Sequence, residues 1–201
     1  KSIKLSNIYF SYNKNDNWIL KNINLEIKKG STVVIKGPTG CGKSTLGNII
    51  IGLLDPTKGQ LFVDDILINN QNKTAWQKNI SIIPQSIFLN DVSIAENIAI
   101  GVDPKKINLE KVKNVAKQAR VADFIESIPS QYEEKVGERG IRLSGGQRQR
   151  IGIARALYRE AKIILFDEAT NQLDTDTESL VMQSINNLNK EITTIFIAHR
   201  L

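Results

Sequence analysis

A glycine-rich stretch, Gly37 to Thr45, constrains this chain more than any other part of it. Its residues fit the pattern of Gly, any four residues, Gly, Lys, and then Ser or Thr. An apolar β-branched run, Thr32 to Ile35, precedes it, and an apolar helical pattern, Leu46 to Leu54, follows. The stretch therefore predicts a strand, a tight loop and a helix, with backbone amides and the positive end of the helix dipole directed at a phosphate.

Two side chains of this loop have the chemistry that a bound nucleotide needs. Lys43 is the expected point charge on the β- and γ-phosphates, and Ser44 is the expected hydroxyl ligand of Mg²⁺. The alternative is an ordinary glycine-rich turn, but the flanking strand and helix patterns favour a phosphate site. The remaining residues expected to cradle phosphate are Gly37, Pro38, Thr39, Gly40, Cys41, Gly42 and Thr45.

The composition is that of an ordinary globular domain. The 201 residues are 41% hydrophobic and 24% charged, with a net charge of +6. Lysine is spread along the chain, so this charge does not by itself indicate a nucleic-acid surface. Cys41 is the only cysteine, which excludes an internal disulfide. No signal peptide or membrane span is visible. Both ends fall next to strand-like segments, which indicates a domain taken from a longer protein.

The first half of the chain reads mainly as strands. Ile3 to Tyr12 and Ile19 to Ile27 alternate around a polar turn, which predicts an antiparallel hairpin. Gln60 to Ile68 predicts two short strands, and Ile80 to Ile83 predicts a buried one that ends before Gln85. Tyr12 itself has two interpretations, a routine strand aromatic or a ring on which adenine stacks.

The second half contains helical patterns. Helices are expected from Asp91 or Ser93 to Ala99, over Leu109 to Val121, and over Asp123 to Ile128. Ser144 followed three residues later by Gln147 is a capping-box signature for a helix that continues through Tyr158. It is either a well-capped helix alone or a second anion site, since Gly145 and Gly146 expose amides at a positive helix end.

The last part of the chain supplies acidic residues at a strand end. Lys162 to Glu168 is a buried-strand pattern that ends in Asp167 and Glu168. Ligands of open α/β sheets bind at the carboxyl ends of strands, so Asp167 suits Mg²⁺ coordination and Glu168 suits activation of an attacking water. The alternative is a solvated acidic turn. Asp174 to Leu188 predicts a helix, and Ile192 to Ala198 a strand followed by His199, which is either structural or a γ-phosphate contact.

Together these motifs resemble the nucleotide-binding domain of ATP-binding cassette (ABC) transporters over nearly the whole chain. The resemblance identifies Gly37 to Thr45 as the Walker A loop and Leu143 to Gln147 as the LSGGQ signature. The remaining matches are Tyr12 as the adenine-stacking aromatic, Gln85 as the Q-loop glutamine on the metal, Asp167 as the Walker B aspartate, Glu168 as the catalytic glutamate, Asp174 as the D-loop aspartate and His199 as the switch histidine.

The resemblance also implies an architecture. It implies an α/β fold with a P-loop NTPase, RecA-like core, an antiparallel β subdomain and an inserted α-helical subdomain. The core would comprise residues 1–85 and 148–201, and the helical subdomain residues 86–147. Two such domains would pair head to tail around two ATP and Mg²⁺, each ATP lying between one Walker A loop and the partner's signature residues Ser144, Gly145 and Gly146.

Local patterns are similar to those of the exporter class. Val136 to Gly140 resembles the short loop that exporters have before the signature, and Phe88 to Ile98 fits the same class. The resemblance thus implies an ATPase at the cytoplasmic face of a membrane, the bacterial inner membrane being favoured. Its partners would be a second nucleotide-binding domain, identical or different, and a transmembrane domain, with no nucleic acid. Its cargo would be a lipid, oligosaccharide or peptide.

The alternatives are a soluble ABC ATPase acting on ribosomes or DNA, a non-hydrolysing regulatory module, and a small-molecule kinase. The loop Val136 to Gly140 disfavours the first, Glu168 and His199 the second, and the signature the third. Two departures from the family pattern stand out, namely Cys41 at a position where Ser or Ala is common, and Asn171-Gln172 in place of Ser-Ala before Leu173.

Overall fold

The computed structural model describes residues 2–13, 17–167, 179, 183 and 191–198. The chain divides into two compact units, each described here by itself. The first comprises residues 1–80, 162–168 and 190–201, and the second residues 81–161 and 169–189. The chain therefore leaves the first unit twice and returns to it twice, each time adding a segment to it.

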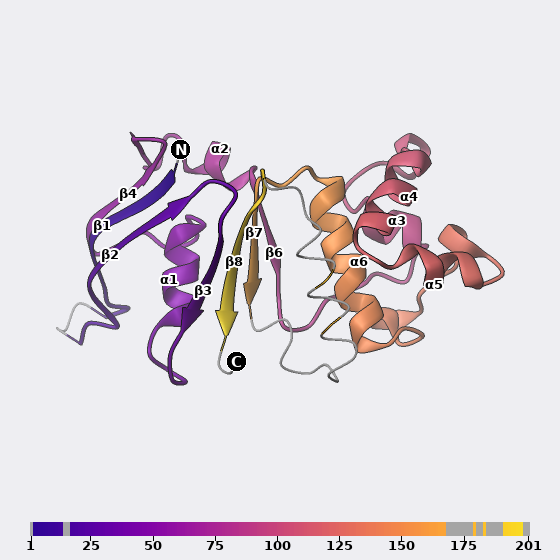
Figure 1. Cartoon of the computed structure of the whole chain (residues 1–201), viewed down its shortest axis with the longest axis horizontal. Helices are drawn as coiled ribbons and strands as arrows, with labels where there is room; N and C mark the ends of the chain where they lie inside the picture. Colours follow the sequence, from indigo (N-terminus) through magenta and orange to yellow (C-terminus); the bar gives the residue numbers. More distant parts are fainter. Residues whose placement is uncertain (1, 14–16, 168–178, 180–182, 184–190, 199–201) are drawn as a thin grey trace. The chain divides into compact units, whose positions relative to one another are not determined.

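The predicted hairpin is confirmed as part of a four-stranded antiparallel sheet in the order β2-β1-β4-β5 (Figure 1). Ser2 pairs with Lys28 and Phe10 with Leu20, with two irregularities between them. Asp64 and Asp65, which join β4 to β5, both have positive φ, 51° and 67°. The strands are β1 (Ser2–Phe10), β2 (Leu20–Lys28), β4 (Lys58–Val63) and β5 (Ile66–Leu67).

A parallel sheet in the first unit brings the carboxyl ends of its strands to one edge. β3 (Thr32–Lys36) pairs with β8 (Thr193–Ala198), and β8 pairs with β7 (Ile163–Asp167). Lys36 lies opposite Ala198, and Asp167 opposite Ile197. The predicted strands are thus confirmed, and the carboxyl ends of β3 and β7 lie one strand apart. β6 (Ile80–Ile83) takes the chain from the first unit into the second.

Helix α1 (Lys43–Ile50) packs between the two sheets of the first unit. Gly47 lets it approach β8, because a Cβ there would lie only 2.7 Å from Ile197 Cδ1. The helix ends four residues before the predicted Leu54. The Leu53 amide bonds to the Asn48 carbonyl and the Gly52 amide to the Ile49 carbonyl, a terminating motif that requires the positive φ of Gly52, 72°.

A short helix that the sequence analysis did not predict completes the core of the first unit. α2 (Lys73–Gln77) buries Trp76, whose side chain is 7% exposed. Trp76 Nε1 donates to the Ile50 carbonyl over 3.0 Å. This bond satisfies one of the last carbonyls of α1, which have no partner within the helix. Trp76 therefore fixes the far end of the helix that begins at the phosphate loop.

The described part of the second unit is mainly helical, and it confirms the predicted helices that lie before residue 159. Its core includes apolar side chains from each α-helix described there, among them Ile98, Val112, Ile125 and Ile151, each fully buried. The α-helices are α3 (Ile94–Ile98), α4 (Leu109–Gln118), α5 (Ala122–Ser127) and α6 (Gly145–Tyr158), and the 3-10 helices are η1 (Pro104–Lys106), η2 (Gln131–Glu133) and η3 (Glu138–Gly140).

Helices α4 and α6 end on residues in the left-handed region. Arg120 (φ 55°) follows α4, and the Val121 amide bonds to the Ala116 carbonyl. Glu160 (φ 56°) follows α6 in the same way. This motif usually contains glycine, and the sequence has arginine there, so it gave no signal for the helix end. As a result, α4 stops at Gln118, three residues before the predicted Val121. Within the described residues, no helix combines the length and apolar character needed to cross a bilayer.

Candidate functional site

The phosphate loop leads from β3 into α1, as predicted. Gly40 and Gly42 both have positive φ, 80° and 93°. Gly42 is the N-cap of α1, and its carbonyl accepts the first helical hydrogen bond, from the Leu46 amide over 2.8 Å. Among the described residues, no side chain makes a capping hydrogen bond to this helix. An eight-residue helix thus begins on a glycine, and the positive end of its dipole has no such cap within the described part of the chain.

Lys43, the first residue of α1, turns back over the loop. Its ammonium donates to the carbonyl oxygens of Gly37 and Pro38 over 2.8 and 3.0 Å, and the residue is 6% exposed. The loop therefore holds a cation within its own curve. The hydroxyl-bearing Ser44 is exposed beside it. A phosphate at this place would meet a positive charge and a hydroxyl together.

Tyr12, far from the loop in sequence, lies at the same cavity. Its hydroxyl lies 3.2 Å from Thr45 Oγ1. The ring packs edge-on against Phe10, with the centroids 4.8 Å apart and the planes at 89°, and the residue is 61% exposed. One face of an aromatic ring is thus available to a flat ligand. The cavity has a volume of about 340 Å³ and is lined by Tyr12, Ile19, Thr39, Gly40, Gly42, Lys43, Ser44 and Thr45.

Asp167 ends β7 at the same edge of the sheet. One strand, β8, separates β7 from β3, and two strand spacings amount to about 10 Å. That distance suits a ligand held between the phosphate loop and the carboxylate. Among the described residues, no group of three or more His, Cys, Asp or Glu side chains forms a preassembled metal site. A magnesium ion here would therefore take much of its coordination from the nucleotide and water, as Mg²⁺ commonly does.

The second predicted anion site belongs to the second unit. Ser144 Oγ accepts from the Gln147 amide over 3.2 Å, and Gln147 Oε1 accepts from the Ser144 amide over 2.8 Å. The predicted capping box is thus present at the start of α6. Ser144 remains exposed, while Gly146 is buried. Gln85 also lies in this unit, exposed, and its carbonyl accepts from Gln149 Nε2 over 3.4 Å.

Several predicted residues lie outside the part of the chain that the structure describes. They include the predicted base Glu168, the predicted switch histidine His199, and Asp174 with the helix expected from it. The departure at Asn171 and Gln172 also lies there. Their roles stay predictions made from the sequence.

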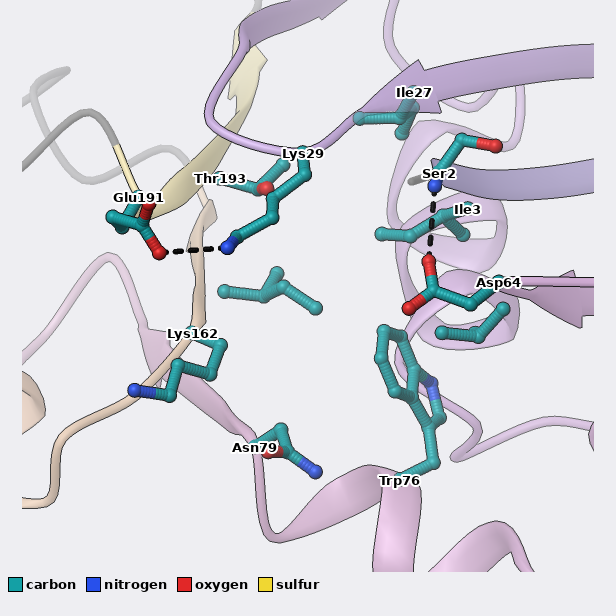
Figure 2. A pocket seen from close by; sticks show the side chains of 12 residues that line it. Ser2, Ile3, Ile27, Lys29, Asp64, Trp76, Asn79, Lys162, Glu191 and Thr193 are labelled. Carbon is teal, nitrogen blue, oxygen red and sulfur yellow. Dashed lines mark hydrogen bonds and ion pairs between the residues drawn. The ribbon is translucent and has the colours of Figure 1, made fainter.

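A larger cavity of the first unit, of about 580 Å³, lies at the amino ends of the parallel strands (Figure 2). Ile3 and Trp76 are among the apolar residues that line it. Lys29 and Glu191 form an ion pair of 2.6 Å at one side, and the Ser2 amide donates to Asp64 at the other. None of the residues that line it is a predicted site residue. Lys43 and Asp167, two of the predicted site residues, lie instead at the opposite, carboxyl ends of the parallel strands.

The structure also adds residues that the sequence analysis did not select. Ile19 lines the loop cavity and is 37% exposed just before β2 begins. The sequence signal that could have identified Ile19 as a site residue is its position as an apolar residue directly after a polar turn. Gln149 and Arg155, on α6, bind backbone carbonyls around Gln85 and Phe88. Only the tertiary structure shows these contacts, because their partners are more than 60 residues away.

Comparison with known proteins identifies the family. A profile described as "ABC transporter" matches residues 20–171. The chain belongs to the ABC transporter family. The solved structure of a bacterial Atm1-family ABC exporter with ATP bound matches all of the chain, with a TM-score of 0.86 and 40% identity. This match confirms the predicted α/β, P-loop NTPase fold with its antiparallel sheet.

Two curated members illustrate the relationship. ATP-binding cassette sub-family B member 5 of Mus musculus is 43% identical over 91% of this chain. The ATP-dependent lipid A-core flippase of Pseudoalteromonas translucida is 39% identical over 99% of it. This ABC transporter chain spans 15% and 34% of these two proteins, and 35% of the Atm1-family exporter.

Proposed function

We propose that this chain is the ATP-binding and ATP-hydrolysing domain of a membrane exporter. One observation carries the proposal. The positive end of α1, Lys43 and the exposed Tyr12 ring all meet in one cavity, in a chain that matches an ATP-bound exporter along its whole length. Lys43 and the loop amides would bind the phosphates, and Tyr12 would stack on adenine.

We assign the hydrolytic step to the remaining residues of the family motifs. Ser44, Gln85 and Asp167 would hold Mg²⁺, which when bound offsets charge on the phosphates. Glu168 would orient the attacking water and accept its proton, and His199 would steady the γ-phosphate. Such catalysis rests on positioning and charge stabilisation, and it needs no covalent intermediate.

Two chains would be needed for a complete site. Ser144 is exposed at the positive end of a 14-residue helix, so it is available to an anion. We place the nucleotide of one protomer between its own Walker A loop and the partner's signature residues, Ser144, Gly145, Gly146 and Gln147, with Asp174 near the dimer contact. The subdomains would be residues 1–85 with 148–201, and residues 86–147.

A groove in the second unit suits the transmembrane partner. It has a volume of about 630 Å³, and two of its apolar side chains are strongly exposed, Phe88 at 60% and Ile141 at 81%. Exposed apolar side chains beside charged ones are typical of a protein contact. The domain would thus work at the cytoplasmic face of a membrane. Its cargo would be a lipid, an oligosaccharide or a peptide. The groove is lined by Ser86, Ile87, Phe88, Glu138, Arg139, Ile141 and Arg148.

The test is the ATPase rate per molecule, measured against the concentration of this chain, with Glu168→Gln as control. A composite site requires two chains, so the rate should rise with concentration and vanish in the control. A rate independent of concentration, from a monomer by mass, would contradict the two-chain site. Wild-type turnover in the control would contradict the role of Glu168. Failure to bind ATP would refute the proposal as a whole.

A further inference from the structure

The segment Gln85–Phe88 lies along one face of α6 in the second unit. It contains no helix or strand, so its backbone carbonyls need partners from elsewhere. Gln149 Nε2 donates to the Gln85 carbonyl over 3.4 Å, and Arg155 Nη1 donates to the Phe88 carbonyl over 3.2 Å. Six helical residues span about 9 Å and three extended residues about 10 Å. The two contacts therefore match in spacing.

Between these contacts, α6 has no side chain where the segment approaches. A Cβ on Gly152 would lie 2.7 Å from Ile87 Cδ1 and 3.3 Å from Ile87 Cγ1. Ile87 is 8% exposed, and Gly152 is buried. The Ile87 side chain thus occupies the space that a larger residue at position 152 would take. Close packing of this kind resists sliding, because any displacement produces either overlap or a void.

Arg155 also binds Asn97 of α3, the helix that follows the segment Gln85–Phe88 in the chain. Its Nε donates to the Asn97 carbonyl over 2.9 Å, and Nη2 donates to Asn97 Oδ1 over 3.4 Å. Asn97 is fully buried, and it exchanges two hydrogen bonds of 3.0 Å with the backbone of Asn90. Arg155 therefore joins Phe88 and Asn97 to the helix. Its loss would remove the side-chain donor to the Phe88 and Asn97 carbonyls and so break both attachments to α6.

The same helix begins at the signature. α6 runs without interruption from Gly145 to Tyr158, and Ser144 caps it. A regular helix keeps its residues at fixed separations, so Ser144 and Gly152 move together. At the other end of this connection, the ring of Phe88 is 60% exposed. An exposed apolar side chain is thus linked through packed atoms and hydrogen bonds to the signature serine.

We propose that Arg155 and Gly152 are positioning residues that fasten the segment Gln85–Phe88 to α6. A partner that displaces Phe88 then displaces the Ser144 end of α6 as part of the same rigid body. This inference rests on the proposed function, which supplies both the membrane partner at Phe88 and the nucleotide at Ser144.

The test is a double-mutant cycle on the full-length transporter in lipid nanodiscs, with ATP turnover as the readout. Phe88→Ala and Arg155→Met should each lower kcat about tenfold while leaving the KM for ATP within twofold. In the double variant, kcat should be less than twofold below that of Arg155→Met alone. Without Arg155, a partner that contacts Phe88 is no longer connected to α6, so removing the Phe88 ring has little further effect. Arg159→Met is the matched control, since Arg159 is exposed at the end of α6. There Phe88→Ala should keep its full effect.

A second pair of variants tests the packing. Gly152→Ala should lower kcat, and adding Ile87→Val, which removes the Cδ1 atom at 2.7 Å, should restore it to within threefold of wild type. Rescue would show that this contact matters, and the Tm of each variant, measured alongside, would separate loss of positioning from general destabilisation. If Arg155→Met does not fold, the comparison of Gly152→Ala with Gly152→Ala plus Ile87→Val is sufficient to test the inference.

Losses that multiply in the cycle, or no rescue by Ile87→Val, would overturn the inference while leaving the proposed function standing. A wild-type transporter that hydrolyses no ATP would overturn both.

Discussion

Gly40 and Gly42 offer a matched test of the phosphate loop. Their φ angles are similar, 80° and 93°, but their surroundings differ. A Cβ on Gly40 would have no atom within 4 Å. A Cβ on Gly42 would lie 2.9 Å from Ile19 Cγ2 and 3.0 Å from Leu20 Cδ2. Gly40→Ala therefore introduces backbone strain alone, whereas Gly42→Ala adds a steric clash with the start of β2.

The expected losses follow from these two terms. A left-handed conformation costs an L-residue roughly 1–2 kcal/mol. If the loop must keep this conformation to bind ATP, Gly40→Ala weakens binding about 5- to 30-fold. Overpacking adds about 1–3 kcal/mol at Gly42. Leu20 belongs to the core of the first unit, at 5% exposure, so the clash also lowers stability. The Tm of Gly42→Ala should fall about 2–12 °C below that of Gly40→Ala.

The assay is equilibrium binding of a fluorescent, non-hydrolysable ATP analogue, together with thermal unfolding of each variant. Adding Ile19→Ala to Gly42→Ala removes the nearest clashing atom and should recover part of the affinity. Wild-type affinity in Gly40→Ala would refute the claim that the loop needs a positive φ there. Equal affinity and equal Tm in the two variants would refute the steric argument.

Three further predictions concern single residues. Alkylation of the exposed Cys41 with iodoacetamide should block binding of the ATP analogue unless the analogue is bound first, and loss that the analogue cannot prevent would contradict this. Hydrogen bonds from Ser93, first from its backbone and then from its side chain, hold the pKa of Glu96 below its ordinary value of 4.5. Because the folded pKa is lowered, this stabilisation is complete above pH 4.5 and is lost as the pH falls through the folded value. Denaturation from pH 6 to pH 3 should therefore show a loss of stability that is absent in Glu96→Gln, because Gln can keep the capping box but does not titrate. Arg120→Gly should raise the free energy of unfolding by about 1 kcal/mol, since φ is 55° there, whereas Arg120→Ala should not.

Local patterns in the sequence were sufficient for much of the fold. The hairpin, the parallel strands and the capped helix at Ser144 follow from alternation, apolar runs and a capping signature, whereas the sequence leaves the start of the earlier helix open between Asp91 and Ser93. The phosphate loop follows from a motif whose spacing has a mechanical reason. These features depend on residues near one another in the chain, so one sequence is enough to find them.

Other features depend on tertiary contacts. α2 is five residues long, and its anchor is the bond from Trp76 to Ile50. The ends of α4 and α6 use Arg120 and Glu160 where glycine is the usual signal, so their boundaries could not be read from propensity. The placement of Tyr12 at the loop cavity required the packing of β1 against the helix that follows the loop. Distant partners of this kind leave no periodic trace.

The pairing of β3 with β8 has a consequence for synthesis on the ribosome. Thr32 pairs with Thr194, 162 residues later (194 − 32). At about 5–20 residues per second, the strand that leads into the phosphate loop waits roughly 8–30 s for the neighbour that completes its hydrogen bonds. Hairpins form in microseconds, so the antiparallel sheet has ample time to assemble first. Nascent chains that stall before β8 emerges would carry a finished hairpin and an unpaired β3, a species suited to chaperone capture.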